Sequence, residues 1–294
     1  GAQGHQVFRW KVPRPEDPEE LESVARYLAI AIYNRLATFG AERLWLHAPS
    51  SLYGRLVDYL RDDRYGKLGD FLTIVNEATF RIAEASARTI QELEATASQG
   101  TVAPSPALDP RRGRVIGVDI GGSDVKVVAM EDGKVAYSAE PTWRELLGDG
   151  RTRPDEIGDP AEHLQVIRRL IHEAREAAGF GDQLEAIGVS INLVVRNGRV
   201  VGRGPVVQGL NDEQIRTVIT PLRETLAAEF GVPVGIANDG DMSALWSAVD
   251  QQLTNVWALS MGTGLASGYV DAQGFTTELL GEMGNVVVDV NPDA

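Results

Sequence analysis

The first hundred residues carry apolar side chains with the period of an α-helix. Such positions recur from Pro18 to about Gly40, with acidic residues in the first turn and a glycine at the end, which predicts a helix. The run LWLHA before Pro49 predicts a short strand. A second helix with a serine cap is expected over SLYGRLVDYLRDD, and a third, longer one over Gly69 to Ala97. Residues 1–97 are therefore interpreted as a mostly helical module.

Regular periodicity stops after this module. Residues 98–113 contain Gly, Ser and prolines that interrupt both helical and strand patterns, so we assign them to a linker. From residue 114 the pattern becomes strand, glycine-rich turn and strand, with Asp132 and Gly133 at a hairpin position. Helix-like HLQVIRRLIHEAREAAG and TVITPLRETLAAEFG then alternate with strand-like LEAIGVSINLVV and PVGIAND. This alternation predicts an α/β domain over residues 114–294.

Composition narrows the classes of function. The formal net charge is −14, and most of the acidic excess follows residue 113, which disfavours binding to a nucleic-acid backbone. The absence of cysteine excludes disulfides and thiolate zinc sites and fits a reducing compartment. The apolar runs are shorter than the roughly 20 residues of a membrane span, and no secretory signal is visible. We therefore expect a cytoplasmic protein that binds neither nucleic acid nor a membrane.

Two glycine-rich turns between strands are candidate phosphate cradles. The first lies in DIGGSDVK, where glycines let backbone N–H groups approach phosphate oxygens, Ser123 adds a hydroxyl donor and Asp119 can position magnesium. This motif fits neither a dinucleotide fingerprint nor a Walker loop. The second is Gly262-Thr263-Gly264 within LSMGTGLASGYVD. Either turn alone can be a plain β-hairpin, whereas the pair is typical of folds that grip a nucleotide between two hairpins.

A carboxylate follows a strand between these two turns. In ANDGDMSAL an apolar strand ends and a helix begins, which places Asp239 at a strand terminus. Phosphoryl transfer to an alcohol needs a carboxylate that orients the hydroxyl and accepts its proton. Asp239 is the candidate for this role. The alternative is that Asn238 or Asp239 only caps the following helix.

Four segments, in this order, resemble the ROK sugar kinases of the hexokinase and actin-like superfamily. DIGGSDVK resembles the first phosphate motif of that family, ANDGDMSAL its NDANAAAL segment, MGTGLASGYVD its GTGIGGGIV segment, and GEMGN at residues 281–285 its GEIGH. The resemblance covers residues 114–294 and implies an actin-like, ribonuclease H-like α/β fold. It also implies a homodimeric kinase that uses ATP and Mg²⁺ to phosphorylate a sugar hydroxyl.

The same resemblance implies a role for individual residues. Asp239 would be the general base, and the sugar hydroxyls would be bound by Asn238, Glu282 and Asn285. The first phosphate loop would comprise Asp119, Gly121, Gly122, Ser123 and Lys126, with Asp119 also binding Mg²⁺. The second would comprise Gly262, Thr263 and Gly264.

Departures from the family pattern leave two other functions open. Asn285 replaces the histidine of GEIGH and no CxCGxxGC cluster follows, so zinc is not expected. GVSINL at residues 188–193 replaces the family's GVPGP, and we expect the segment that completes the family's C-terminal lobe to be missing. A catalytically weakened, sugar-binding or regulatory ROK-like protein is therefore the alternative. A DNA-binding regulator is less favoured, because the N-terminal helices lack a winged-helix pattern and a basic face.

Overall fold

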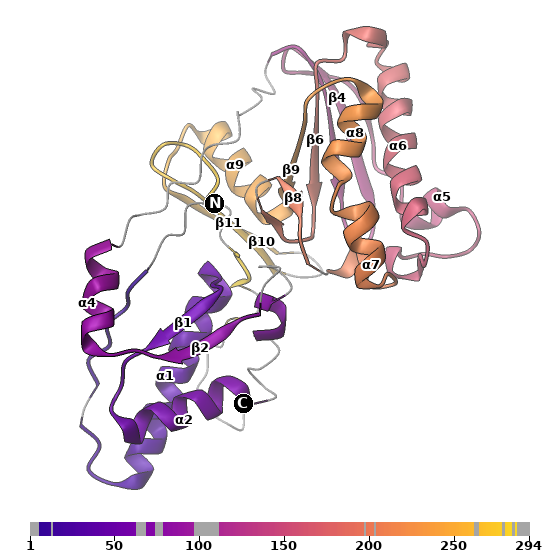
Figure 1. The fold of residues 1–294 in the computed structure, drawn as a ribbon. Coiled ribbons are helices and arrows are strands. Elements are labelled where there is room, and N and C mark those ends of the chain that lie inside the picture. Colours follow the sequence, from indigo (N-terminus) through magenta and orange to yellow (C-terminus); the bar gives the residue numbers. More distant parts are fainter. Residues whose placement is uncertain are drawn as a thin grey trace. The chain divides into compact units, whose positions relative to one another are not determined.

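The computed structural model describes residues 6–12, 14–62, 69–73, 79–96, 112–196, 198–202, 204–261, 265–277, 280–283 and 286. The chain forms two compact units, Gly1–Ala103 with Leu279–Ala294, and Pro104–Glu278 (Figure 1). The sequence-based division into 1–97, 98–113 and 114–294 stays a prediction, and linker residues 98–111 lie outside the described ranges. No helix within those ranges is both long and apolar enough to cross a membrane.

The first unit combines helices with a small parallel sheet. Its elements are α1 (Pro18–Phe39), β1 (Arg43–Leu46), α2 (Ser50–Arg61), β2 (Arg81–Glu84) and α4 (Ala87–Thr96). Strands β1 and β2 pair in parallel, and α1 packs against α2 around a core that includes Leu28, Ile32 and Leu56. Leu280 and Val286 also pack against this core.

Helix α1 forms where the sequence predicts it. The side chain of Asp17 accepts hydrogen bonds from the backbone N–H groups of Glu19 and Glu20, both at 2.8 Å. Pro18 occupies the first turn, and Gly40, at a φ of +69°, ends the helix. These are the start and stop preferences expected of a helix, so the prediction is confirmed.

The serine cap predicted for the second helix is wrong. Helix α2 begins at Ser50, its N-cap residue is Pro49, and no side chain in the described part of the chain caps it. Both serines lie inside the first turn, where their hydroxyl groups cannot take the N-cap role.

The long helix predicted over Gly69–Ala97 is also wrong. Residues 69–73 are helical, but β2 and then a separate α4 follow. Pairing with β1 holds RIAE as a strand, and this tertiary contact overrides a helix-compatible composition. Ser86 then starts a new helix, because its hydroxyl accepts a hydrogen bond from the N–H of Thr89 at 3.0 Å.

The second unit is built on a five-stranded sheet of order β5-β4-β3-β6-β9. The strands of this unit, including two further two-stranded pairs, are β3 (Arg114–Ile120), β4 (Val125–Glu131), β5 (Lys134–Ala139), β6 (Ala186–Ile191), β7 (Val195–Arg196), β8 (Arg199–Val200), β9 (Val234–Asn238), β10 (Val256–Met261) and β11 (Leu265–Val270). Its helices are α5 (Trp143–Leu147), α6 (Pro160–Ala177), α7 (Asp212–Gln214), α8 (Leu222–Phe230) and α9 (Asp239–Gln251). A π-helical turn, Ile215–Ile219, separates α7 from α8.

Strands β3, β4 and β5 form an antiparallel meander, whereas β3, β6 and β9 run parallel. The predicted hairpin turn is confirmed at Asp132 and Gly133, whose φ angles are +48° and +79°. Because β3, β6 and β9 are parallel neighbours, their carboxyl ends meet at one edge of the sheet.

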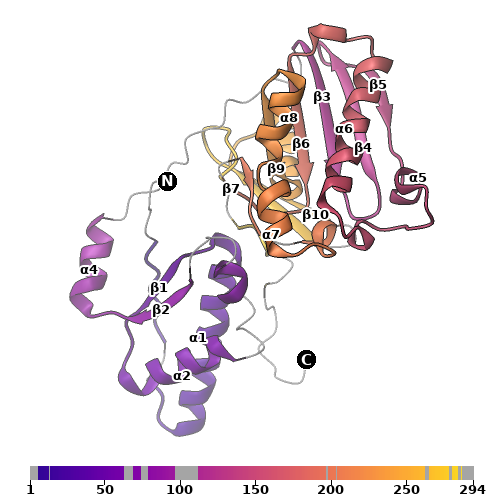
Figure 2. The ribbon, with the colours of Figure 1, turned by 45° about the vertical axis from the view of Figure 1, so that its right-hand side comes forward.

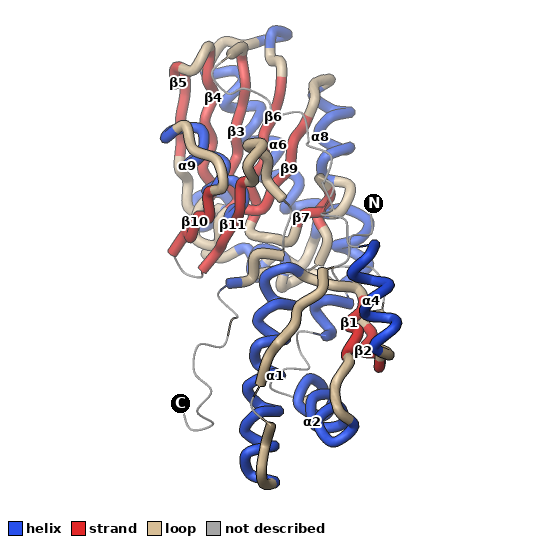
Figure 3. Tube along the Cα trace, turned by 90° about the vertical axis from the view of Figure 1, so that its left-hand side faces the viewer, coloured by secondary structure: helices blue, strands red, loops and turns tan. Residues whose placement is uncertain are grey.

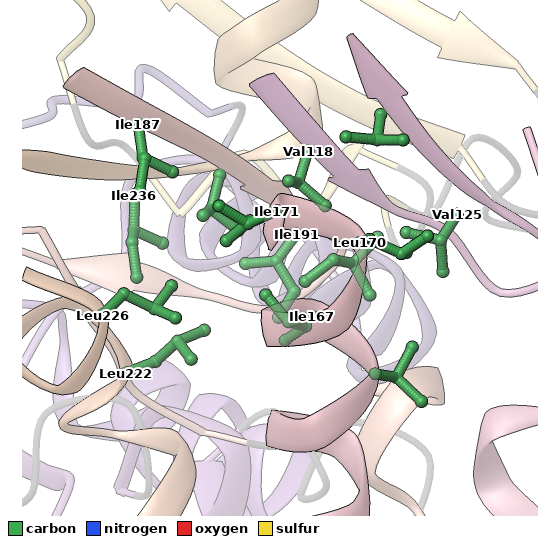
Figure 4. Packing of buried hydrophobic residues seen from close by; sticks show 14 of the residues in the cluster. Val118, Val125, Ile167, Leu170, Ile171, Ile187, Ile191, Leu222, Leu226 and Ile236 are labelled. Atoms are coloured by element: carbon green, nitrogen blue, oxygen red, sulfur yellow. The ribbon is translucent and has the colours of Figure 1, made fainter. Parts of the chain in front are cut away.

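Helices α6 and α8 cover one face of this sheet (Figures 1 and 2). The core contains Val118, Ile187 and Ile236 from the strands and Ile171 and Leu226 from the helices (Figure 4). This continuous apolar layer fixes the strands, and therefore the positions at which they end.

Helix α9 and the β10–β11 hairpin pack together on the other side of the sheet (Figure 3). Ala244, Ala248 and Val270 form a small core between them. Every second residue of β3 is buried, and Asp119 lies in the alternate, partly exposed set. Side chains alternate between faces along a strand, so Asp119 lies on the face opposite the main core.

Candidate functional site

The carboxyl edge of the central sheet carries some of the polar groups that the sequence singled out, and one that it did not. Ile120 of β3 is in register with Ile191 of β6, which in turn is in register with Asn238 of β9. The next residues along the three strands are Gly121, Asn192 and Asp239. One sheet edge therefore carries the glycine-rich turn, a carboxamide and the candidate catalytic carboxylate.

Asn238 joins this edge to helix α9. Its Oδ1 accepts a hydrogen bond from the backbone N–H of Gly240 at 2.8 Å, which makes Asn238 the N-cap of α9. Its Nδ2 donates to the backbone carbonyl of Leu193 at 3.1 Å. Asn238 therefore caps α9, as the sequence allows. A carboxamide has two lone pairs and two N–H groups, so hydrogen-bonding capacity remains for a ligand.

Asp239 is the first residue of α9, partly buried at the carboxyl end of β9. Burial raises the pKa of its carboxyl group, and the negative charge of Asp119 raises it further, while the N–H of Gly240, 2.9 Å from Oδ1, acts in the opposite direction. Asp119 and Asp239 are therefore close enough to interact electrostatically. A carboxylate with a raised pKa is a stronger proton acceptor than an ordinary aspartate.

The turn between β3 and β4 is closed by a backbone hydrogen bond from the N–H of Gly121 to the carbonyl of Asp124, 3.0 Å long. Trp143 of α5 holds this turn through two hydrogen bonds. Its Nε1–H donates to the carbonyl of Gly121 at 3.0 Å, and its backbone N–H donates to the carbonyl of Ser123 at 3.5 Å. Trp143 is only 1% exposed, so the turn is anchored to the core of the unit.

Lys126 lies directly opposite Asp119 in the β3–β4 pairing. Its ammonium group forms ion pairs with Asp124 at 2.5 Å and Glu140 at 3.1 Å. The hydrogen bond to Asp124 is the main cause of its raised pKa. Lys126 therefore reaches the edge of the turn with a charge that two carboxylates already partly neutralise.

Not all predicted site residues can be placed. Gly262, Thr263 and Gly264 lie between β10 and β11, outside the described residues, as does Asn285. Glu282 belongs to the first unit, where its N–H donates to the carbonyl of Ala37 at 3.1 Å and the N–H of Gly281 donates to that of Thr38 at 3.0 Å. The end of α1 thus holds this segment of chain in place.

Asp119 suits a magnesium ion that shares its coordination with phosphate. Mg²⁺ is commonly held by one or two carboxylates together with phosphate oxygens and water. A cation bound by Asp119 would offset the negative charge that this carboxylate places near Asp239. In the described ranges, no group of three or more His, Asp or Glu side chains could hold a metal by itself. The carboxylate of Asp119 is a ligand of the kind that Mg²⁺ takes from proteins.

Sequence reasoning missed two residues at this edge. Asn192 directly follows the buried strand β6, and this strand-end position is the signal that could have identified it, as it identified Asp239. Trp143 carried no local signal, because its role depends on a contact with Gly121, which is distant in sequence.

Solved structures resemble parts of this chain. A ROK hexokinase from Thermus thermophilus is 20% identical over 58% of this chain and 50% of that chain, with a TM-score of 0.41. A ROK family protein from Streptococcus pneumoniae TIGR4, solved with sucrose, is 17% identical over 59% and 50%, with a TM-score of 0.41. A ROK family transcriptional regulator, a homolog of the E. coli MLC protein, is 15% identical over 92% and 61%, with a TM-score of 0.44. The chain spans about half the length of the first two.

No curated protein sequence matches the chain. The solved structures show that ROK proteins include sugar kinases as well as transcriptional regulators. A model of the ROK family matches residues 115–293, which is more than half of the chain. The chain therefore belongs to the ROK family and has the actin-like α/β fold that its motifs implied.

Proposed function

We propose that the protein is an ATP-dependent kinase that phosphorylates a hydroxyl group of a sugar or sugar derivative. The observation that carries this proposal is the position of Asp239 at the carboxyl end of β9, where burial and the charge of Asp119 raise its pKa. The glycine-rich turn at Gly121 follows β3 at the same edge of the sheet, with β6 between β3 and β9. A proton acceptor beside a phosphate cradle is the arrangement that phosphoryl transfer to an alcohol requires.

In this proposal the oxygen of the sugar hydroxyl attacks the terminal phosphorus of ATP, and Asp239 accepts the proton that this hydroxyl loses. The bond between that phosphorus and the leaving ADP oxygen then breaks. Backbone N–H groups of Gly122 and Ser123 bind phosphate oxygens, Gly121 shapes the turn through its own hydrogen bond to Asp124, and Asp119 would hold the metal. Mg²⁺, when bound, neutralises charge on the transferring phosphoryl group. Asn238 positions the sugar through the hydrogen-bonding capacity that its cap role leaves.

The roles of Gly262, Thr263 and Gly264 in a second phosphate loop, and of Glu282 and Asn285 in sugar binding, rest on the family motifs. Lys126 is assigned a supporting role at the first loop, because Asp124 and Glu140 already pair with it. We also propose that the protein acts as a homodimer in the cytoplasm, as the family resemblance suggests.

A second candidate is a ROK protein that binds a sugar without phosphorylating it. The observation that favours it is Asn285 in place of the family's GEIGH histidine. An asparagine can donate to and accept from a sugar hydroxyl, but it cannot replace an imidazole in every contact. Under this alternative, sugar binds and Asp239→Asn leaves binding unchanged, but no ADP is released.

The test is a coupled ADP-release assay with Mg·ATP across hexoses, amino sugars, N-acylated sugars and polyols. Asp239→Asn keeps the shape of the side chain and removes the base, so we expect kcat to fall by about 10²- to 10⁴-fold. Asp250→Asn is the matched control, because Asp250 is an exposed residue of the same helix. Turnover that Asp239→Asn does not reduce would refute the general-base role. Wild-type protein that turns over no acceptor would refute the kinase.

A further inference from the structure

Asn192 lies between the two halves of the proposed reaction site. It directly follows β6, the strand between β3 and β9, so it lies between the glycine-rich turn and Asp239 along the sheet edge. Where the family pattern has a proline, this chain has a carboxamide, which both donates and accepts hydrogen bonds.

The donor end of this carboxamide is directed at the glycine-rich turn. The Nδ2 of Asn192 lies 3.9 Å from the point that a Cβ on Gly122 would occupy. Gly122 has no side chain, so the amide group and the backbone of the turn face each other. A phosphate oxygen held by the backbone of the turn would be within reach of this amide.

The acceptor end has a different environment. The Oδ1 of Asn192 is buried, and no donor in the described part of the chain hydrogen-bonds to it. Buried polar atoms nearly always have a hydrogen-bond partner, so an isolated one beside a reactive edge points to a ligand donor. The residue as a whole is half-buried.

The loop that carries Asn192 is held firmly. The Nδ2 of Asn238 donates to the carbonyl of Leu193, which ties the loop to the N-cap of α9. A Cβ on Gly204 would lie 2.8 Å from the carbonyl oxygen of Asn192, so the loop also packs tightly on the opposite side. The carboxamide is therefore held in place before any ligand binds.

We propose that Asn192 binds both substrates: its amide N–H donates to a phosphate oxygen of the nucleotide, and its carbonyl oxygen accepts from a hydroxyl of the acceptor. This proposal rests on the kinase function proposed above and extends it to a residue that the family motifs do not assign. It also specifies the acceptor as a compound that presents a second hydroxyl beside the one that is phosphorylated. A vicinal diol, as in a sugar or polyol, meets this requirement.

Two substitutions separate the two ends of the side chain. Asn192→Asp keeps an acceptor oxygen but replaces the donor with negative charge facing the phosphates. It should raise the KM for Mg·ATP at least tenfold and change the KM for sugar by less. Asn192→Leu is close in shape and removes both functions, so it should raise both KM values at least tenfold. Asn211→Leu is the control: it makes the same change at the N-cap of α7, where it costs stability but should leave both KM values unchanged.

The outcomes distinguish this proposal from the kinase proposal. If wild-type protein phosphorylates a sugar and both Asn192 variants keep wild-type KM values, only the Asn192 proposal is refuted. If wild-type protein has no turnover, equilibrium binding of Mg·AMP-PNP and of sugars is measured instead. Weaker Mg·AMP-PNP binding by Asn192→Asp then supports the donor role without a kinase, and equal binding refutes it. If wild-type protein binds neither ligand, both proposals fail.

Discussion

The close approach of α9 to β11 predicts a large effect of one methyl group beside Asp239. A Cβ added at Gly240 would lie 2.6 Å from the carbonyl carbon of Ser267 and 2.7 Å from its amide nitrogen. Both atoms belong to a paired strand and cannot move independently. Gly240→Ala must therefore push the start of α9 away from β11.

The magnitude follows from two opposing effects. Forcing an extra methyl group into a packed site costs typically about 1–3 kcal/mol, and the upper end applies here because the obstruction is backbone. Replacing glycine by alanine within a helix returns about 1 kcal/mol at most. The expected net loss is about 2 kcal/mol in the free energy of unfolding. At a urea m value of about 2 kcal/mol/M, this lowers the transition midpoint by about 1 M.

The assay is urea unfolding followed by circular dichroism, with kcat/KM measured in parallel. Gly235→Ala in β9 is the matched control, because nothing lies within 4 Å of its added Cβ. It should leave the unfolding free energy within about 0.5 kcal/mol of wild type. Gly240→Ala should also lower kcat/KM at least tenfold, since Asp239 moves with the helix. Equal midpoints for the two variants would refute the close packing inferred here.

Gly268 tests the same contact from the other side. A Cβ there would lie 2.6 Å from the Cα of Asp241, so Gly268→Ala should also destabilise the protein. Since both methyl groups enter one gap, the double variant with Gly240→Ala should lose less than the sum of the single losses. Strict additivity would show that the two glycines do not share a contact.

Three other predictions concern the surroundings of the site. Trp143→Phe removes the donor to Gly121, so the free energy of unfolding in urea should fall by about 1–3 kcal/mol and the KM for Mg·ATP should rise. An unchanged KM would show that Trp143 does not support the turn. Asp119→Asn removes a negative charge and should lower the pKa of Asp239 in a ¹³C NMR titration of its carboxyl group; an unchanged or higher value would contradict their proximity. Burial lowers the pKa of His163 to about 4, so between pH 6.5 and 4 the unfolded chain binds a proton that the folded chain does not. The free energy of unfolding should therefore fall by up to about 3 kcal/mol over this range. His163→Gln should flatten the pH profile of urea midpoints, and an unchanged slope would refute the assignment.

The elements that could be predicted are those with several local signals at one place. Helix α1 has an aspartate cap, a proline in the first turn and a terminal glycine, and the β4–β5 hairpin has Asp132-Gly133. Strand β2 has no such signals. Its RIAE sequence is compatible with a helix, and only pairing with β1, far away in the chain, makes it a strand.

The same distinction applies to the site. Asp119, Asn238 and Asp239 could be identified because each lies at a strand end within a recognisable motif. Trp143 could not be assigned a role, because its contact with the glycine-rich turn exists only in the fold. Asn192 has the same strand-end position as Asp239, but its closeness to that turn also becomes visible only in the fold. The candidate residues for the chemistry are thus visible in the sequence, whereas the contacts that surround them need the structure.

The electrostatics of Asp239 explain why a cost to stability is expected at this edge. Its pKa in the folded protein is raised, so the folded state binds its proton more tightly than the unfolded state does. The corresponding stabilisation is present at acidic pH and is lost as pH rises through the raised pKa. Above that pKa the ionised carboxylate is therefore destabilising, and a neutral asparagine would be more stable there. Under the kinase proposal this cost serves the reaction, because a metal–nucleotide complex and a hydroxyl proton would both use the charge of the carboxylate.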